Sequence, residues 1–195
     1  MTIRVKNLTG EAARAVADDL ARLRISVFRE FPYLYDGTTE YERKYLETYA
    51  KARDGVVVTA FDGDRVIGAA TALPLTAEPD HMAAPFREAG IAPETVFYFG
   101  ESVLEPAYRG RGLGHAFFDG RENHARDLGY TTSAFCAIIR PEDHPRRPAD
   151  YRPLDAFWTK RGYVRQESMT CQMTWQDLDE DSQSPKTLRF WTREL

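Results

Sequence analysis

Apolar positions along the N-terminal part of the chain recur at helical spacing after a short strand-like start. Ile3 to Val5 alternates with polar residues and predicts an edge strand. From Glu11 to about Glu30 the apolar side chains return every three or four residues, which predicts a first helix ending near Pro32. A Thr-x-x-Glu capping box at Thr39 begins a second amphipathic run to about Ala50. We therefore expect a strand followed by two helices.

The next region has the pattern of a β-hairpin. Val56 to Phe61 and Val66 to Leu73 are rich in β-branched and apolar residues, and the turn Asp62-Gly63-Asp64 separates them. The stretch from Pro74 to Glu94 is punctuated by prolines and has a short helical pattern only around Phe86 to Ala89. We expect an irregular excursion there, in the position of a lid.

A strand–helix–strand unit organises the second half of the chain. Thr95 to Leu104 predicts a strand, Gly112 to Leu128 a helix and Thr131 to Ile139 another strand. A crossover of this kind makes its two strands parallel. The remaining expected elements are a proline-rich loop (Arg140 to Pro153), a short helix (Leu154 to Arg161), and strands at Met169 to Trp175 and Leu188 to Thr192.

Composition limits the class of protein. The chain has 195 residues, 43% hydrophobic and 29% charged, with no linker-like segment, so we expect one domain over residues 1–195. It contains no apolar run of membrane-spanning length and no signal-peptide pattern, which predicts a cytoplasmic protein without a membrane partner. A net charge of -4 disfavours nucleic acid as a partner. Cys136 and Cys171 lie in separate apolar stretches, so we expect buried thiols and no metal site.

A glycine turn between the strand ending at Leu104 and the following helix is the strongest chemical signal. The sequence from Arg109 to Gly114 contains three glycines and two arginines, and leads into the first turn of a helix. Unpaired N–H groups and the positive end of the helix dipole suit a phosphate there. The segment lacks the Gly-Lys-Ser/Thr of a P-loop and the downstream acid of a dinucleotide fingerprint. A purely structural connector is the alternative.

This turn resembles the pyrophosphate loop of the GCN5-related N-acetyltransferases (GNAT). Arg109, Gly112 and Gly114 match the pattern Arg/Gln-x-x-Gly-x-Gly/Ala, and Val103-Leu104-Glu105-Pro106 matches the strand end that precedes it. Phe157 to Tyr163 is similar to a second segment of the family, which closes the acyl-CoA site. The expected element order is also that of the family.

The resemblance implies an α/β (α+β) fold, a single GNAT-like domain with a mixed, mostly antiparallel sheet of about seven strands, flanked by helices and splayed between strands 4 and 5. It implies acetyl-CoA as co-substrate, no metal, and the homodimers common in the family as a possible assembly. Backbone groups of Val103 and Leu104 would hold the pantetheine arm. The remaining implied cofactor-binding residues are Arg109, Gly110, Arg111, Gly112, Leu113, Gly114 and Trp158.

Glu101 is the leading candidate for the base that deprotonates an acceptor amine. A carboxylate inside an apolar strand is costly unless it is paired or useful, and burial favours its protonated form. A structural salt bridge to an arginine is an equally weighted alternative. Tyr98 is the second candidate, with a core tyrosine as its alternative. Regular alternation would place Tyr98 and Glu101 on opposite faces unless a bulge intervenes.

The acid that protonates the leaving thiolate is not evident from the sequence. Trp158 stands where the family usually has a tyrosine, and an indole is no acid. Tyr151 could supply a hydroxyl from the preceding loop, with simple packing as the alternative. Candidate acceptor-binding residues are Tyr33, Tyr35, Arg140 and His144, against roles in helix packing for the tyrosines and a solvated loop for the others.

We therefore expect an N-acetyltransferase that moves acetyl from acetyl-CoA to a primary amine of a small molecule or peptide. Attack would occur directly in a ternary complex, because neither cysteine has an activating basic neighbour in the sequence. The alternative, favoured by Trp158, is a sensor that binds acyl-CoA without turnover.

Overall fold

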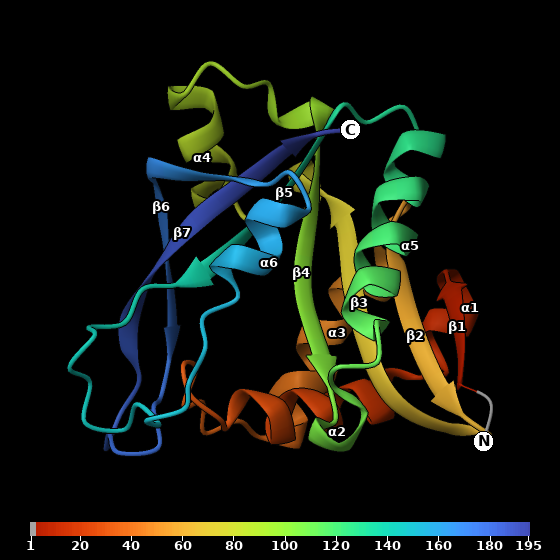
Figure 1. Cartoon of the computed structure of the whole chain (residues 1–195). Helices are drawn as coiled ribbons and strands as arrows, with labels where there is room; N and C mark the ends of the chain where they lie inside the picture. Colours follow the sequence, from red (N-terminus) through yellow and green to blue (C-terminus); the bar gives the residue numbers. More distant parts are fainter. Residues whose placement is uncertain (1–2) are drawn as a thin grey trace.

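The computed structural model describes residues 3–195, except the side chains at 43–45, 48 and 50, and shows a seven-stranded mixed sheet between two layers of helices (Figure 1). The strand order is β1-β2-β3-β4-β5-β7-β6, and among these neighbours only β4 and β5 are parallel. The predicted fold class is confirmed. The strands are β1 (Ile3–Leu8), β2 (Val56–Asp62), β3 (Arg65–Pro74), β4 (Val96–Leu104), β5 (Thr132–Ile138), β6 (Val164–Trp175) and β7 (Ser184–Glu194).

Helices cover both faces of the sheet. In Figure 1, α5 and α6 lie in front of the sheet, with α3 and α4 behind it. Phe117 of α5 packs with Phe97 and Phe99 on the first face, and Leu20 of α2 packs with Val103 on the other. The α-helices are α1 (Gly10–Arg14), α2 (Ala17–Phe28), α3 (Thr39–Lys51), α4 (Asp80–Glu88), α5 (Leu113–Asp127) and α6 (Asp155–Lys160), and the 3₁₀ turns are η1 (Leu75–Ala77), η2 (Pro93–Thr95) and η3 (Pro106–Tyr108).

β4 and β5 pair over a short distance and then diverge. Their parallel register comprises Val96 with Thr132, Phe97 with Ser133 and Tyr98 with Ala134, and β4 continues to Leu104 without β5 beside it. Figure 1 shows the two strands separating toward their C-terminal ends, with α6 in front of the opening. The splay between strands 4 and 5 is thus present, and it separates the two halves of the sheet at the end of β4 that leads into the glycine turn.

A β-bulge interrupts β4 beside this splay. Ala72 pairs with Phe99 and Ala70 with Ser102, so Gly100 and Glu101 together oppose the single residue between them on β3. The bulge resets the alternation of side chains along the strand. Tyr98 lies in the core with α4, and Glu101 pairs with a residue of α2, so both are directed to the face covered by α2, α3 and α4.

Arg121 of α5 holds this bulge from the opposite face. Its side chain is 1% exposed and donates to the carbonyl oxygens of Thr71 (3.3 Å) and Glu101 (3.2 Å) and to Ser102 Oγ (2.9 Å). The guanidinium also lies over the ring of Phe99, 4.3 Å from its centroid. Burial lowers the pKa of Arg121 to about 10, which leaves it charged at neutral pH. A buried cation thus satisfies backbone carbonyls at the irregular point of the strand.

We expect Gly100→Ala to destabilise the fold. A Cβ at this position would lie 2.2 Å from Tyr49 Oη and 2.6 Å from Thr71 Oγ1, and both groups are held inside the protein. Such overpacking should lower the free energy of unfolding by about 1–3 kcal/mol. Urea denaturation would measure it, with Gly114→Ala as the control, because its Cβ would meet its nearest atom at 3.6 Å. Equal stability of the two variants would contradict the expectation.

The N-terminal helices differ from the prediction in two details. The predicted helix from Glu11 to Glu30 is broken at Ala15 and Val16 into α1 and α2, because Ala13, Val16 and Leu20 all turn into one core cluster. The capping residue of α3 is Thr38, whose Oγ1 accepts from the N–H of Tyr41 at 3.4 Å. The capping box predicted at Thr39 is wrong, since its acid, Glu42, is buried in an ion pair with α2.

The proline-rich stretch 74–94 is more ordered than the sequence indicated. Its residues form η1, α4 and η2, and Phe86 of α4 packs edge-on against Phe190 of β7 at 4.9 Å between ring centroids. Because Leu75, Met82 and Phe86 are all buried, this segment belongs to the core, and the prediction of an irregular lid is wrong. The last two strands are also longer than predicted, beginning at Val164 and Ser184.

Candidate functional site

The glycine turn leaves a row of amide N–H groups without partners. Gly110 (φ 74°) and Gly112 (φ 82°) have left-handed backbone conformations, and Gly112 is the N-cap residue of α5. Within residues 3–195, no acceptor takes a hydrogen bond from the amides of residues 110–114. Free N–H groups at the positive end of the helix dipole, with no Cβ at the two turning positions, make a site that fits a phosphate group.

The arginine side chains of this turn fold back onto the protein. Arg109 donates to the carbonyl oxygen of Leu104 (3.3 Å) and pairs with Glu30 (2.8 Å). Arg111 donates to the carbonyl oxygen of Ala107 and lies over the ring of Tyr108. The backbone of the turn, more than these side chains, is therefore the surface available to an anion.

An arginine shared by two carboxylates lies on the other side of β4. Arg24 of α2 donates to Glu42 of α3 and to Glu101 of β4, the latter at 2.5 Å, and all three side chains are at most 9% exposed. Burial and the neighbouring Glu42 carboxylate raise the pKa of Tyr35, which lies in the turn after α2. Glu101 thus has the salt bridge that was one of its two sequence interpretations. The salt bridge does not exclude the second interpretation, in which Glu101 is a general base, because protonation of Glu101 would leave Arg24 paired with Glu42.

The turn after α2 brings aromatic rings to this carboxylate. We call the segment Phe28–Tyr35 the aromatic turn. Burial raises the pKa of Tyr33, and the electrostatic influence of Cys136 and Tyr151 adds to it. Arg24 lowers the same pKa and Glu101 raises it. The Tyr33 ring packs on Phe28 at 4.6 Å between centroids, and the Arg24 guanidinium lies over the Phe28 ring at 5.1 Å. The predicted acceptor-binding residues Tyr33 and Tyr35 therefore lie beside the splay, on the Glu101 side of the sheet.

Tyr98 is a core residue, and we do not retain it as a catalytic candidate. Its side chain is 2% exposed, and its hydroxyl hydrogen bonds with Cys136 Sγ at 3.1 Å. Burial raises the pKa of Tyr98 well above its usual value, so the phenolate that a base requires is strongly disfavoured. Cys136 and Cys171 are free and buried, as predicted.

Tyr151 and His144 meet the aromatic turn from the loop after β5. Their rings lie 4.7 Å and 5.6 Å from the ring of Phe31 between centroids. Burial raises the pKa of Tyr151, whose ring is also covered by Arg147 at 5.3 Å. His144 Nδ1 accepts from the N–H of Arg146 at 3.2 Å. Tyr151, predicted to donate a proton to the leaving thiolate, and His144, predicted to bind the acceptor, thus lie beside the same ring, and their roles stay predictions.

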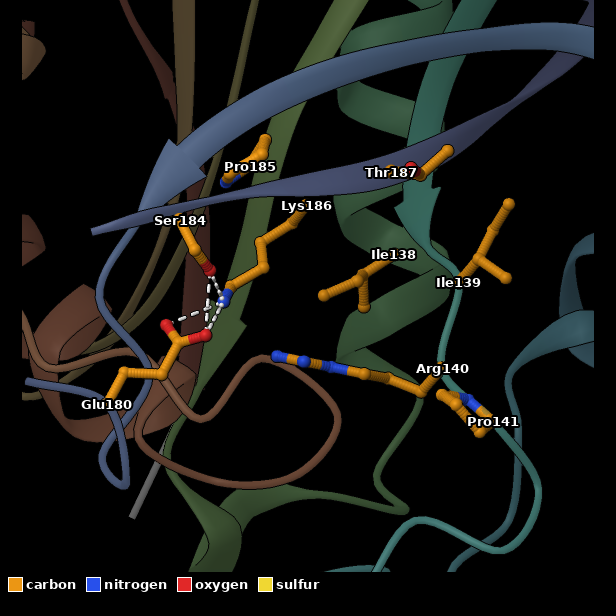
Figure 2. A pocket seen from close by; sticks show the side chains of 9 residues that line it. All are labelled: Ile138, Ile139, Arg140, Pro141, Glu180, Ser184, Pro185, Lys186 and Thr187. Carbon is orange, nitrogen blue, oxygen red and sulfur yellow. Dashed lines mark hydrogen bonds and ion pairs between the residues drawn. The ribbon is translucent and has the colours of Figure 1, made fainter. Parts of the chain in front are cut away.

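Arg140 has a structural position where the sequence predicted a substrate contact. Its guanidinium donates to the carbonyl oxygens of Pro32 (2.8 Å) and Tyr33 (2.9 Å) and pairs with Asp177 (2.7 Å). With its donors used in this way, Arg140 fixes the aromatic turn and does not offer a free cation to a substrate carboxylate. Figure 2 shows it extending beneath a groove of about 650 Å³ at the ends of β5 and β7.

The same groove contains a buried lysine whose charge is compensated. Lys186 donates to both carboxylate oxygens of Glu180 (2.7 and 2.8 Å) and to Ser184 Oγ (2.5 Å), as the dashed lines in Figure 2 mark. It is 7% exposed and also lies 3.5 Å from Asp177. Arg140, Lys186, Asp177 and Glu180 therefore tie the β6–β7 connection to the aromatic turn.

We expect this cluster to make stability depend on acidic pH. Lys186, the N–H of Asp177 and Ser184 lower the pKa of Glu180 to about 2. A carboxyl whose pKa is lower in the folded state stabilises it above the unfolded pKa, and this contribution is lost as pH falls from about 4 toward 2. Glu180→Gln should cost about 1 kcal/mol or less at pH 7. The gap in Tm between wild type and Glu180→Gln should close by pH 2, and a constant gap would contradict the assignment.

α6 covers the splay from the α5 side. Trp158 packs on Phe135 of β5 at 5.0 Å and on Trp191 of β7 at 5.2 Å. The helix is fastened to α5 by a buried carboxylate, Glu122, which accepts from Arg161 at 3.1 Å. The predicted cofactor-binding tryptophan thus faces β5 from the helix that borders the opening, on the face opposite Glu101.

The sequence model of the acetyltransferase (GNAT) family matches residues 20–149, from α2 through β4, the glycine turn and β5 into the following loop. The chain belongs to this family. The match contains both the turn that fits a phosphate and the bulged strand beside it, which are the parts of the site just described. No curated protein matches it in sequence.

Solved structures with the GNAT fold resemble the whole chain. A ribosomal-protein-alanine N-acetyltransferase from Brucella melitensis is 13% identical with a TM-score of 0.63, covering 98% of this chain and 99% of its own. A GNAT-family acetyltransferase from Staphylococcus aureus Mu50 is 12% identical (TM-score 0.64; 100% and 99% covered). The yncA protein from Salmonella typhimurium, solved with its cofactor acetyl-CoA, is 14% identical (TM-score 0.61; 100% and 95% covered). At these identities the likeness concerns the fold.

Among residues 3–195, no helix has the length and apolar character needed to cross a membrane. The same residues contain no group of three or more His, Cys, Asp or Glu side chains that could hold a metal ion.

Sequence reasoning missed the two buried arginines of the site. Arg24 and Arg121 occupy positions on the apolar faces of α2 and α5, where Leu23 and Phe117 are their buried neighbours. A buried arginine needs an acidic or polar partner, so an arginine on the apolar face of a predicted helix was the signal in the sequence for a buried polar contact. Their partners come from other elements, so the sequence could not name them.

Proposed function

We propose that this GNAT protein transfers acetyl from acetyl-CoA to a primary amine by direct attack in a ternary complex. The observation that carries the proposal is the bulge in β4, which directs Glu101 to the face of the aromatic turn while the glycine turn and α6 border the other face of the same splay. Two substrates could thus approach β4 from opposite sides.

The residues of the glycine turn fit the phosphates of acetyl-CoA. Free amides of residues 110–114 would bind the pyrophosphate, since they have no acceptor within residues 3–195. Leu104 and Val103 would contact the pantetheine arm through their backbone, on the part of β4 that β5 leaves unpaired. Acetyl-CoA supplies the acetyl thioester, and the protein's contribution on this side is to hold and orient it.

Glu101 would take the proton of the acceptor amine. A protonated amine has no lone pair for attack, so a carboxylate within reach of the acceptor increases the reactive fraction. Arg24 would balance the charge of the Glu101 carboxylate, and its pairing with Glu42 would prevent an isolated buried cation after proton transfer. Tyr151 and Tyr33 are the hydroxyl groups that border this side and could serve the leaving thiolate.

The test is an assay of the purified protein with acetyl-CoA and a pooled amine library. We expect free thiol and a single class of acetylated amine, detected by mass spectrometry, together with a rise in Tm on adding coenzyme A. A rise in Tm without product from any amine would favour the acyl-CoA sensor, for which the absence of a hydroxyl at Trp158 is the supporting observation. No change in Tm and no product would refute the proposal.

A further inference from the structure

A small cavity lies beside Tyr35, at the C-terminal end of the aromatic turn. It has a volume of about 220 Å³ and is formed between the segment that leads into α3 and the end of β6. Its walls combine aromatic rings, hydroxyls, amides and one carboxylate, contributed by Tyr35, Asp36, Thr38, Tyr41, Thr174, Trp175, Gln176 and Gln183.

The chemistry of this lining fits a cation. Tyr35, Tyr41 and Trp175 offer aromatic faces, which attract an ammonium group through their negative quadrupole. Asp36 adds a carboxylate, and none of the lining residues is Lys, Arg or His. Asp36 already pairs with Arg29 at 2.9 Å, but both side chains are about half exposed, and exchange of such a pair for another cation costs little.

The cavity is connected to the proposed amine site through short contacts. Trp175 Nε1 donates to the carbonyl oxygen of Tyr33 at 3.2 Å, and the Tyr33 and Trp175 rings lie 6.1 Å apart. Tyr35 forms part of the cavity wall, and its pKa is raised by burial and by Glu42, the carboxylate that shares Arg24 with Glu101. The aromatic turn therefore borders both the cavity and the proposed amine site beside Glu101.

We propose that this cavity, which we call the aromatic cation pocket, binds a second cationic group of the acceptor. The inference rests on the proposed function and makes it more specific: the acceptor is a molecule with two amines, of which one is acetylated beside Glu101 while the other stays a charged ammonium in the pocket. A free diamine or polyamine and a peptide with two basic side chains share this chemistry.

The experiment compares alkyl monoamines with α,ω-diamines of equal length, from three to twelve carbons, using wild-type protein and acetyl-CoA. We expect one range of diamine lengths to exceed the matched monoamines in kcat/KM by about 10- to 100-fold, mainly through a lower KM, as expected for one carboxylate and aromatic rings in the pocket wall. A blocked peptide with two lysines at varied separation distinguishes a peptide source from a free diamine.

Variants of the pocket supply the decisive control. Tyr41→Leu removes one exposed ring, and Gln183→Lys places a positive charge in the wall; both should reduce the diamine preference to about the twofold statistical factor while leaving monoamine kinetics as in wild type. Asp36→Asn should act in the same direction. Asp64→Asn is the matched control, because Asp64 is an exposed acid paired only weakly with Arg4 at 3.6 Å in the β2–β3 turn.

Each outcome decides the inference. A diamine preference that Tyr41→Leu and Gln183→Lys abolish, and Asp64→Asn keeps, supports it. Equal kcat/KM for monoamines and diamines, or a preference unchanged in both pocket variants, overturns it while the proposed function stands. Acetylation of no amine at all overturns the proposed function and this inference with it.

Discussion

Glu101→Gln is expected to lower kcat for a protonated primary amine by about 100- to 10,000-fold, the usual effect of losing a general base. Glutamine keeps the size of the side chain and can still hydrogen bond to Arg24, but it cannot accept the amine proton. Steady-state kinetics at pH 7 would measure the loss.

Two controls distinguish the role of Glu101 as a base from its role as an ion-pair partner of Arg24. Glu42→Gln removes the other carboxylate on Arg24, which is fully buried, and should disturb stability without a comparable loss of kcat. An acceptor that is already neutral at pH 7, such as methoxyamine, carries no ammonium proton that must be removed before attack, so its rate should fall far less in Glu101→Gln. If Glu42→Gln loses as much activity, or if the rate with methoxyamine falls as far, Glu101 acts through the ion pair and not as a base.

Gly112→Asp is expected to reduce acetyl-CoA affinity by at least about 100-fold. The residue has φ 82° at the N-cap of α5, where any side chain strains the backbone, and a carboxylate would stand among the free amides proposed to bind pyrophosphate. Isothermal titration with acetyl-CoA would measure the loss.

Gly90→Asp is the matched control for this variant. Gly90 also has a positive φ of 75°, and an added Cβ there would meet no atom within 4 Å, so the strain and the charge are similar while the position is remote from the turn. We expect it to lower Tm and leave acetyl-CoA affinity unchanged. Affinity unchanged in Gly112→Asp would refute the proposed loop.

The sequence predicted best those features that depend on neighbours in the chain. The hairpin of β2 and β3 follows from two apolar runs around Asp62-Gly63-Asp64, and the parallel β4–β5 pair follows from the single helix that separates them. The glycine turn was visible because its residue types and order are themselves the signal.

Features that depend on partners from distant segments were not predictable. The bulge at Gly100 and Glu101 exists through its register with β3, and it reverses the face expected for Glu101 relative to Tyr98. The sequence gives the charge of Arg140 but not its partner. The structure shows that its guanidinium donates to the carbonyl oxygen of Pro32, which identifies a structural role. The prolines of residues 74–94 led to the prediction of an irregular segment. In the structure Pro79 and Pro93 lie at the starts of α4 and η2, where proline is compatible with a helix, and α4 accommodates Pro85 in its interior.

The divergence of β4 and β5 also bears on aggregation. Where the two strands separate, each leaves a row of backbone groups without a strand partner, and such edges recruit strands from other chains. Here the two open edges face each other inside one molecule, and α6 lies in front of the opening (Figure 1). The unpaired backbone groups of β4 and β5 can therefore hydrogen bond to a narrow, extended small molecule, while the opening is too enclosed for a β-strand of a second chain.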